Sequence, residues 1–198
     1  MKKFISTALI FIGVILILYP VIGRWYNQYQ QEKLMKEWVD EGEATDKSTE
    51  TQDEATPEES ESKSHYKPRV IGSISIKKIS IDIPIVEGTT QQDLKFGAGH
   101  LKGTATLGAK GNTALAGHRS YTLGKMFNRL NEVTSGDEII IKTKKDTYKY
   151  VVYEKKVVEP TDFSVLKSQG DESLLTLITC EPIYIATHRL IVHAKLVS

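Results

Sequence analysis

The 198-residue sequence contains one cysteine, Cys180, and this scarcity limits what the protein can be. A single thiol cannot build an intramolecular disulfide framework or a metal site that needs several thiolates. Tryptophan is also rare, with two residues in the sequence, Trp25 and Trp38, and both precede residue 67. The sequence has no internal repeat and no glycine-rich phosphate loop. With 40% hydrophobic and 26% charged residues, it is not a fully disordered, collagen-like or multi-pass membrane protein.

The net charge of +1 conceals three regions of different character. Residues 1–39 carry five basic and two acidic residues, a balance of +3. Residues 40–66 carry ten acidic and two basic residues, a balance of −8. Residues 67–198 carry 19 basic and 13 acidic residues, a balance of +6. The sequence therefore predicts three parts: an N-terminal anchor with a stalk, a linker, and one folded domain.

The one long hydrophobic run predicts a membrane anchor. Residues 4–22 carry no charge, and 19 residues of helix span about 29 Å, close to the thickness of a bilayer core. Lys2 and Lys3 favour a single-pass protein with a cytoplasmic N-terminus and the domain outside, although Arg24 weakens the contrast. A cleaved signal peptide is the alternative, but the run is long and lacks a small-residue cleavage site. Residues 24–39 continue with helical spacing and predict a juxtamembrane stalk.

The second part reads as a flexible tether. Within residues 40–66 the only apolar residues are Ala44, Ala55 and Tyr66. Such a segment cannot bury enough surface to offset the entropy of ordering its backbone. A flexible chain of 27 residues spans about 30 Å, and repulsion between the acidic residues extends it further.

From residue 67 onward the hydrophobic pattern has the period of a β-strand. Ile74 and Ile76 alternate with serines, and after Lys77 and Lys78 the alternation resumes one residue out of phase. That shift predicts a turn or bulge between two strands, and Pro84 predicts a strand end or an edge. Further strands are expected at 112–117, 138–143, 147–158, 174–179 and 189–197, with short helical turns at 90–96 and 163–168. Seven or eight short strands without a long helix predict an all-β domain, either a closed barrel or a sandwich.

Cys180 is the first candidate for chemistry. It follows the apolar run 174–179 and precedes Glu181 and Pro182, so it is expected where a strand opens into a loop. Catalytic groups concentrate at such positions. The alternative is an inert buried thiol, since free cysteine is among the most buried residue types.

A reactive thiol needs a proton partner, and five histidines compete for that role. His65 lies in the predicted tether, and His193 alternates with apolar residues inside the last strand, where either a surface position or a structural role is expected. His100, His118 and His188 are all expected in loops. The hydrophobic pattern alone does not choose among these three.

Arg189 is the second candidate, because it opens the last predicted strand. If 174–179 pairs antiparallel with 189–197, Arg189 lies directly opposite Cys180 and on the same face. The alternating residues of the last strand are apolar and should face the core: Leu190, Val192, Ala194 and Leu196. Cys180 and Arg189 would then point away from the core into a groove. For Arg189 taken alone, the alternative is a solvated arginine at a strand end.

Three segments resemble a known family, the sortases, which are cysteine transpeptidases of the Gram-positive cell surface. They are Thr-Leu-Ile-Thr-Cys at 176–180, Arg189, and Ala-Gly-His-Arg at 116–119. The resemblance covers about residues 68–198, and the sequence around Cys180 and Arg189 is most similar to class D sortases. It implies a closed seven- or eight-stranded sortase-like β-barrel. It also implies that Cys180 is the nucleophile, His118 the acid/base, and Arg189 the residue that stabilises the substrate carbonyl or oxyanion.

The resemblance further implies a reaction and partners. A sorting signal of the Leu-Pro-x-Thr-Gly type on a secreted protein would be cleaved through a thioester on Cys180. An amine of a lipid-linked peptidoglycan precursor would then release the product. No acidic calcium-binding loop is recognisable, and no metal, cofactor or nucleic-acid partner is expected. The alternatives are an anchored cysteine peptidase that hydrolyses the signal and a non-catalytic β-barrel binding module with an inert Cys180.

Overall fold

The computed structural model describes residues 29, 32–38, 66–119, 126–183 and 185–198. The predicted anchor at 4–22 and nearly all of the tether predicted at 40–66 lie outside the described residues. Residues 32–38 are helical, within the predicted stalk, and Glu37 Oε2 lies 3.0 Å from Lys67 Nζ. Among the described residues, no helix has both the length and the apolar character that a membrane crossing requires.

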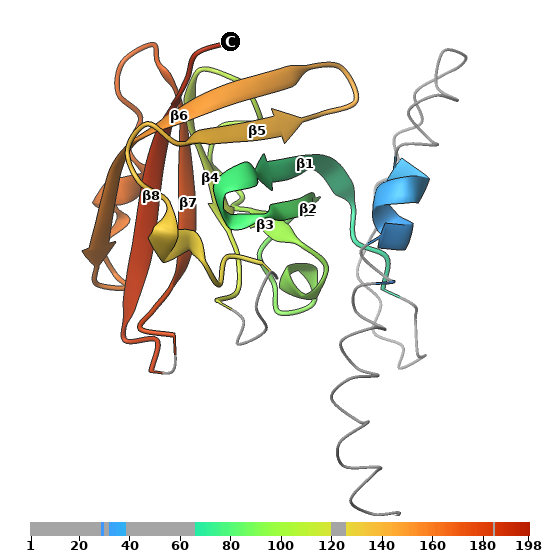
Figure 1. Cartoon of the computed structure of the whole chain (residues 1–198), viewed down its shortest axis with the longest axis horizontal. Helices are drawn as coiled ribbons and strands as arrows, with labels where there is room; N and C mark the ends of the chain where they lie inside the picture. Colours follow the sequence, from blue (N-terminus) through green and yellow to red (C-terminus); the bar gives the residue numbers. More distant parts are fainter. Residues whose placement is uncertain (1–28, 30–31, 39–65, 120–125, 184) are drawn as a thin grey trace, which may run out of the picture.

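The described part of residues 66–198 consists of short strands and single-turn 3₁₀ helices (Figure 1). In chain order they are β1 (Val70–Ile76), η1 (Lys77–Ile79), β2 (Ile81–Glu87), η2 (Asp93–Lys95), β3 (Ala98–His100), β4 (Gly111–Ala116), η3 (Leu130–Glu132), β5 (Glu138–Lys142), β6 (Thr147–Val158), η4 (Phe163–Leu166), β7 (Ser173–Glu181) and β8 (His188–Leu196).

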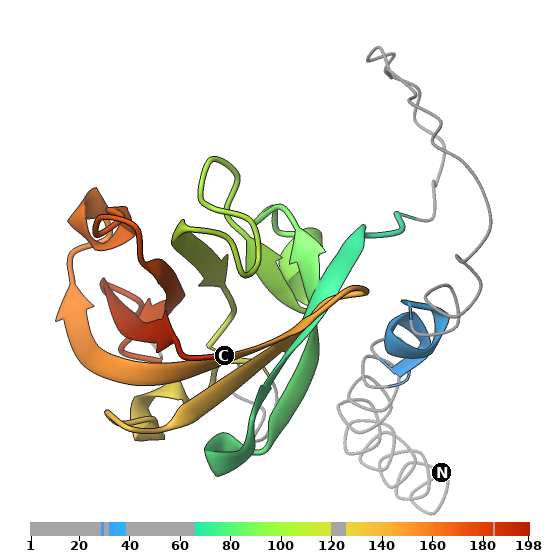
Figure 2. The same ribbon diagram turned by 90° about the horizontal axis from the view of Figure 1, so that it is seen from above.

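These strands form a closed barrel in the order β1-β2-β3-β4-β7-β8-β6-β5, and β5 returns to pair with β1 (Figure 2). The predicted all-β closed barrel is therefore confirmed. Two neighbouring pairs are parallel, β2 with β3 and β4 with β7, and the other pairs are antiparallel. The β4–β7 pair brings residues some 60 positions apart in sequence into contact, and it forms the base of the site described below.

The core is filled by the alternating apolar residues that the strand pattern predicted. Members come from most strands and from the turn η1: Ile74, Ile76, Ile79, Ile81, Ile83, Ile85, Ile139, Ile141, Leu175, Leu177, Leu190, Val192 and Ala194. The shift of phase at Lys77 and Lys78 is the turn η1, which ends at Ser80 in the left-handed conformation (φ 54°). The predicted turn between the first two strands is thus confirmed.

Two details differ from the sequence-based expectation. Pro84 lies inside β2, paired with Ser73 of β1, and β2 is not an edge strand. The proline is tolerated because β3 pairs with β2 only from Ile85 onward, so the β3 side of β2 carries no strand partner at Pro84. The short strand β3 was not predicted, because its sequence Ala-Gly-His has no alternating pattern.

Candidate active site

The site lies at one end of three adjacent strands, β4, β7 and β8. Cys180 is the penultimate residue of β7, and Arg189 is the second residue of β8. The two residues are directly paired in the antiparallel β7–β8 ladder. The predicted opposition of Cys180 and Arg189 is therefore confirmed.

His118 reaches the same level from the other side of β7. Strand β4 runs parallel to β7, with Ala116 paired with Ile178, so two further residues along each chain bring His118 level with Cys180. Two hydrogen bonds join the two segments at this point. Gly117 N donates to the Ile178 carbonyl at 3.0 Å, and Thr179 Oγ1 donates to the Gly117 carbonyl at 2.8 Å. Since neighbouring strands lie about 4.8 Å apart, Cys180 sits between His118 and Arg189.

Burial shows which face of the sheet these residues occupy. In β7, Leu175, Leu177 and Thr179 point into the barrel and are at most 2% exposed. Side chains alternate along a strand, so Cys180 points to the outer face. Cys180 is half-buried, so the residue is not enclosed in the core. In β8, Leu190 is core, and Arg189 by the same alternation faces outward beside Cys180.

The two arginines near Cys180 have different partners. Arg189 Nη1 donates to the carbonyl of Ala186, in the connection from β7 to β8, at 3.1 Å and to that of His188, the first residue of β8, at 2.9 Å. Among the described residues, no carboxylate forms an ion pair with Arg189, so its charge is not neutralised there. Arg119 instead forms an ion pair with Glu181. Within the described residues the charge of Arg189 is thus not matched by an acidic side chain, whereas that of Arg119 is matched by Glu181.

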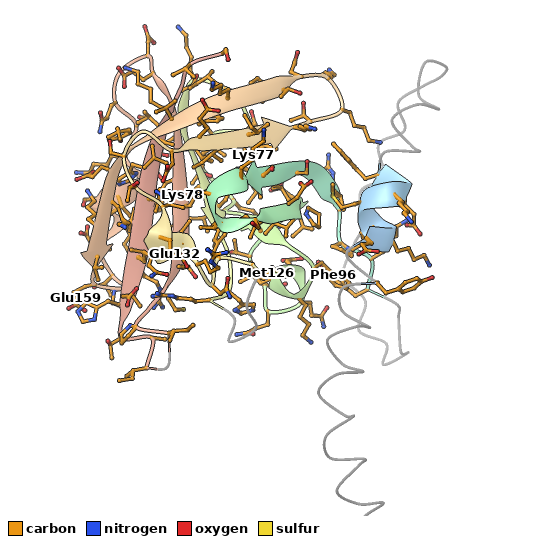
Figure 3. The ribbon with its side chains drawn as sticks, viewed as in Figure 1. Lys77, Lys78, Phe96, Met126, Glu132 and Glu159 are labelled. Atoms are coloured by element: carbon orange, nitrogen blue, oxygen red, sulfur yellow. The ribbon has the colours of Figure 1, made fainter. Side chains whose placement is uncertain are left out.

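The other histidines of the barrel have structural partners. His100 is the last residue of β3, and its Nδ1 lies 3.1 Å from Glu87 Oε1 and its Nε2 lies 3.0 Å from the Ala105 carbonyl. His188 is the first residue of β8, and its Nε2 lies 3.1 Å from Glu159 Oε1. Glu159 directly follows β6 (Figure 3). The expectation that both lie in loops was wrong, because His100 is the last residue of β3 and His188 is the first residue of β8. Both lie outside the apolar runs from which strands were predicted.

Of the two roles expected for His193, a surface position and a structural role, the structure supports the structural one. It is 5% exposed, and its Nδ1 lies 2.9 Å from Thr176 Oγ1. Burial lowers the pKa of His193, Lys156 lowers it further, and Glu154 only partly opposes the shift. Of the three histidines that the pattern left open, His118 is the one that the structure places level with Cys180.

Three residues of this region received no role from the sequence. Thr179 is 2% exposed and ties β7 to Gly117. Arg119 and Glu181 follow His118 and Cys180 in the chain and pair with each other. A polar residue inside an apolar strand run was a usable signal for Thr179. No comparable signal existed for Arg119 and Glu181, whose contact depends on the parallel pairing of β4 with β7.

No group of three or more His, Cys, Asp and Glu side chains suited to a metal ion occurs within the described ranges. The chemistry that the described residues can support is that of a thiol with a neighbouring imidazole and a neighbouring guanidinium. Such a set can generate a thiolate nucleophile, donate a proton to a leaving group and stabilise negative charge on a carbonyl oxygen.

Comparison with known proteins gives a consistent result. The Sortase domain family model matches residues 74–197. Sortase A of Streptococcus agalactiae serotype III (strain NEM316) is 36% identical over 140 residues, which cover 69% of this chain and 56% of that protein. Sortase D of Bacillus subtilis (strain 168) is 31% identical over 147 residues, covering 71% of this chain and 72% of that protein. Against Sortase A of Bacillus anthracis, the match spans 62% of the relative's length.

Solved structures agree on the fold. A Clostridium perfringens Sortase D5 transpeptidase superposes with a TM-score of 0.63 and 29% identity, over 87% of this chain and 98% of that one. Sortase A from Corynebacterium diphtheriae superposes with a TM-score of 0.63 and 35% identity, over 68% of this chain and 63% of that one. With the family model matching well over half of the residues and the barrel shared, the chain belongs to the sortase family.

Proposed function

We propose that the protein is a membrane-anchored cysteine transpeptidase. It cleaves a Leu-Pro-x-Thr-Gly-like sorting signal on secreted proteins and joins the product to an amine of a lipid-linked cell-wall precursor. The observation that carries this proposal is that Cys180 and Arg189 are paired across β7 and β8 and that His118, two residues beyond the end of β4, lies level with Cys180 on the other side of β7. Membership of the sortase family supports the same reaction. The relatives named above include both class A and class D, and the residues around Cys180 favour class D.

The first half of the reaction forms a thioester. The Cys180 thiolate attacks the threonine carbonyl of the sorting signal, and negative charge develops on the carbonyl oxygen. Arg189 stabilises this charge, because its guanidinium is permanently protonated and not neutralised by a carboxylate among the described residues. The threonine–glycine bond then breaks, and protonated His118 donates its proton to the departing glycine amine.

The second half reverses these roles. The acceptor amine attacks the thioester carbonyl, neutral His118 takes the proton that the amine loses, and the Cys180 thiolate leaves. The sorted protein is now linked by an amide to the cell-wall precursor, and the enzyme returns to its starting protonation state. If water replaced the amine, the same site would act as a peptidase, which is the main alternative function.

The N-terminal residues suit an enzyme whose partners are at the membrane. We propose that residues 4–22 cross the membrane once with the N-terminus in the cytoplasm, and that residues 40–66 tether the barrel outside. A tether of about 30 Å raises the effective concentration of enzyme toward membrane-bound substrates without new contacts. Because Cys180 is the one cysteine of the chain, a membrane-impermeant maleimide tests this location directly. Labelling of Cys180 in intact cells is expected, and labelling only after permeabilisation would contradict the proposed location outside the membrane.

The test of the reaction uses the full-length chain in lipid nanodiscs with a Leu-Pro-x-Thr-Gly peptide, with and without a short amine such as triglycine. Mass spectrometry of the quenched reaction should detect a peptide adduct on Cys180, and the amine should redirect the product from acid to amide. Cys180→Ala is the matched control and should show neither species. Product partitioning that ignores the amine would identify a peptidase. Slow thiol alkylation that speeds up only on denaturation would identify an inert, buried Cys180 and exclude both enzymes.

A further inference from the structure

The segments that carry His118 and Cys180 are joined by one more contact beyond the last residue pair of the β4–β7 ladder. Arg119 follows His118, Glu181 follows Cys180, and the two side chains form an ion pair. The same Arg119 Nη1 also donates to the carbonyl of Cys180 at 3.3 Å. One guanidinium nitrogen thus contacts both the backbone of Cys180 and the next side chain along β7.

We propose that Arg119 and Glu181 are positioning residues that hold Cys180 at the correct height and orientation relative to His118. This inference rests on the proposed function, and neither residue is assigned a contact with the substrate. We refer to the pair as the Arg119–Glu181 bridge. It is the third consecutive link between the two chains, after Gly117 N to the Ile178 carbonyl and Thr179 Oγ1 to the Gly117 carbonyl.

The burial of the pair supports a geometric role rather than a contribution to stability. The Arg119 side chain is 8% exposed and that of Glu181 is 25% exposed, so both groups have lost most of their hydration. Arg119 Nε is buried and has no hydrogen-bond partner in the described part of the chain. Burying a charge at this cost is seldom a net gain in folding energy compared with an apolar pair, so specificity of geometry is the better explanation.

Arginine suits this role because its guanidinium is planar and presents fixed donor directions. Glu181 both accepts a hydrogen bond and neutralises Arg119, so that of these two arginines beside Cys180 only Arg189 keeps an unmatched charge among the described residues. The two arginines therefore have separate roles, with Arg189 acting on the substrate and Arg119 acting on the protein. Misplacement of reacting groups by about 1 Å can cost a hundredfold in rate, so the bridge should affect kcat more than substrate binding.

The test is a double-mutant cycle on the full-length chain with Arg119→Met, Glu181→Gln and the double variant. Each single change should lower kcat on the sorting peptide at least about tenfold while KM stays within about threefold. The double variant should lose no more kcat than the worse single variant, because the two residues act as one unit. If Arg119→Met does not fold, Glu181→Gln carries the test, since it keeps the size of the side chain.

The matched control is Glu172→Gln, which removes the Glu172–Lys195 ion pair at the opposite end of β7 and β8. It should leave kcat and KM unchanged. Amide hydrogen exchange supplies a readout that needs no substrate. Exchange in peptides covering 115–119 and 178–183 should accelerate at least about tenfold in Glu181→Gln and stay unchanged in the control.

Each outcome decides the inference. Unchanged kcat in Glu181→Gln, or a rise in KM without a fall in kcat, would overturn the proposed role of the bridge. So would single-variant effects on kcat that multiply in the double variant, or unchanged amide exchange in Glu181→Gln. A wild-type chain that does not turn over the peptide would instead contradict the proposed function, and the exchange comparison would then decide whether the bridge exists.

Discussion

Gly117 offers a direct test of how packing behind the site sets its geometry. A Cβ atom added at Gly117 would lie 2.6 Å from Cδ2 and 2.9 Å from Cε2 of Phe127, a fully buried side chain. Optimal carbon–carbon contacts are at about 3.5 Å or longer, so the ring would have to move by nearly 1 Å. Gly117 does not have a positive φ, and its backbone would accept alanine without strain. The expected damage from Gly117→Ala is therefore steric.

The size of the effect follows from the burial of the ring. Overpacking a well-filled core costs about 1–3 kcal/mol of the free energy of unfolding. For a domain of this size that corresponds to a fall in Tm of about 4–12 °C. The displacement would also reach the site, because Phe127 N donates to the carbonyl of His118 at 3.1 Å. A shift of His118 by a large fraction of 1 Å should lower kcat by about ten- to a hundredfold.

The assay combines thermal unfolding, followed by far-ultraviolet circular dichroism, with cleavage of the sorting peptide. Tryptophan fluorescence is unsuitable, because both tryptophans precede the barrel. Phe127→Leu provides the control: alone it destabilises the core, but together with Gly117→Ala it makes room for the new methyl group. The double variant should therefore be more stable than the sum of the single effects predicts. Wild-type Tm and kcat in Gly117→Ala, or strict additivity in the cycle, would refute the steric explanation.

Four further predictions concern the site and its surroundings. Cys180→Ala should abolish turnover and change Tm by less than about 3 °C, because the side chain is small and half-buried. His118→Ala should lose nearly as much activity, whereas His100→Ala should keep kcat and lower Tm, since it removes partly buried hydrogen bonds to Glu87 and Ala105. Equal losses of kcat in the two variants would contradict the choice of histidine. Arg189→Lys should lower kcat at least about tenfold, because an ammonium lacks the planar fork, and near-wild-type kcat would exclude the assigned role. Burial lowers the pKa of His193, so the unfolded chain takes up its proton first as the pH falls. The urea midpoint should therefore fall as the pH drops through about 6.5, and less so in His193→Gln; an equal pH dependence in both proteins would rule His193 out as its source.

The part of the site formed by neighbouring strands could be predicted from the sequence. Cys180 and Arg189 are nine residues apart and flank a short connection, so antiparallel pairing of the two apolar runs fixes their opposition. The alternation of Leu190 and Val192 then decides which face is core. Local pairing and period-two burial are the two properties that a single sequence reports most directly.

The part that depends on distant pairing could not be predicted from the residue pattern. Parallel pairing of β4 with β7 needs a long crossover and leaves no turn signal, so the pattern gave no reason to prefer His118 over His100 or His188. The family resemblance made that choice. The position of Pro84 in the interior of β2 was missed for a related reason. It depends on β3 being too short to reach Pro84, and the sequence of β2 does not report the length of β3.

The two threonines of residues 176–180 explain how this distant pairing is specified. Thr176 Oγ1 donates to Asn112 Oδ1 of β4 at 2.7 Å, and Thr179 Oγ1 donates to the Gly117 carbonyl at 2.8 Å. These side-chain hydrogen bonds link β7 to β4 at two levels, one on each face of the sheet. A parallel pair has no hairpin to set its register, and a slip of one residue would turn every side chain of one strand to the other face. The segment that leads to His118 would then no longer be level with Cys180. The register on which the proposed chemistry depends is therefore encoded in polar residues placed within an otherwise apolar strand.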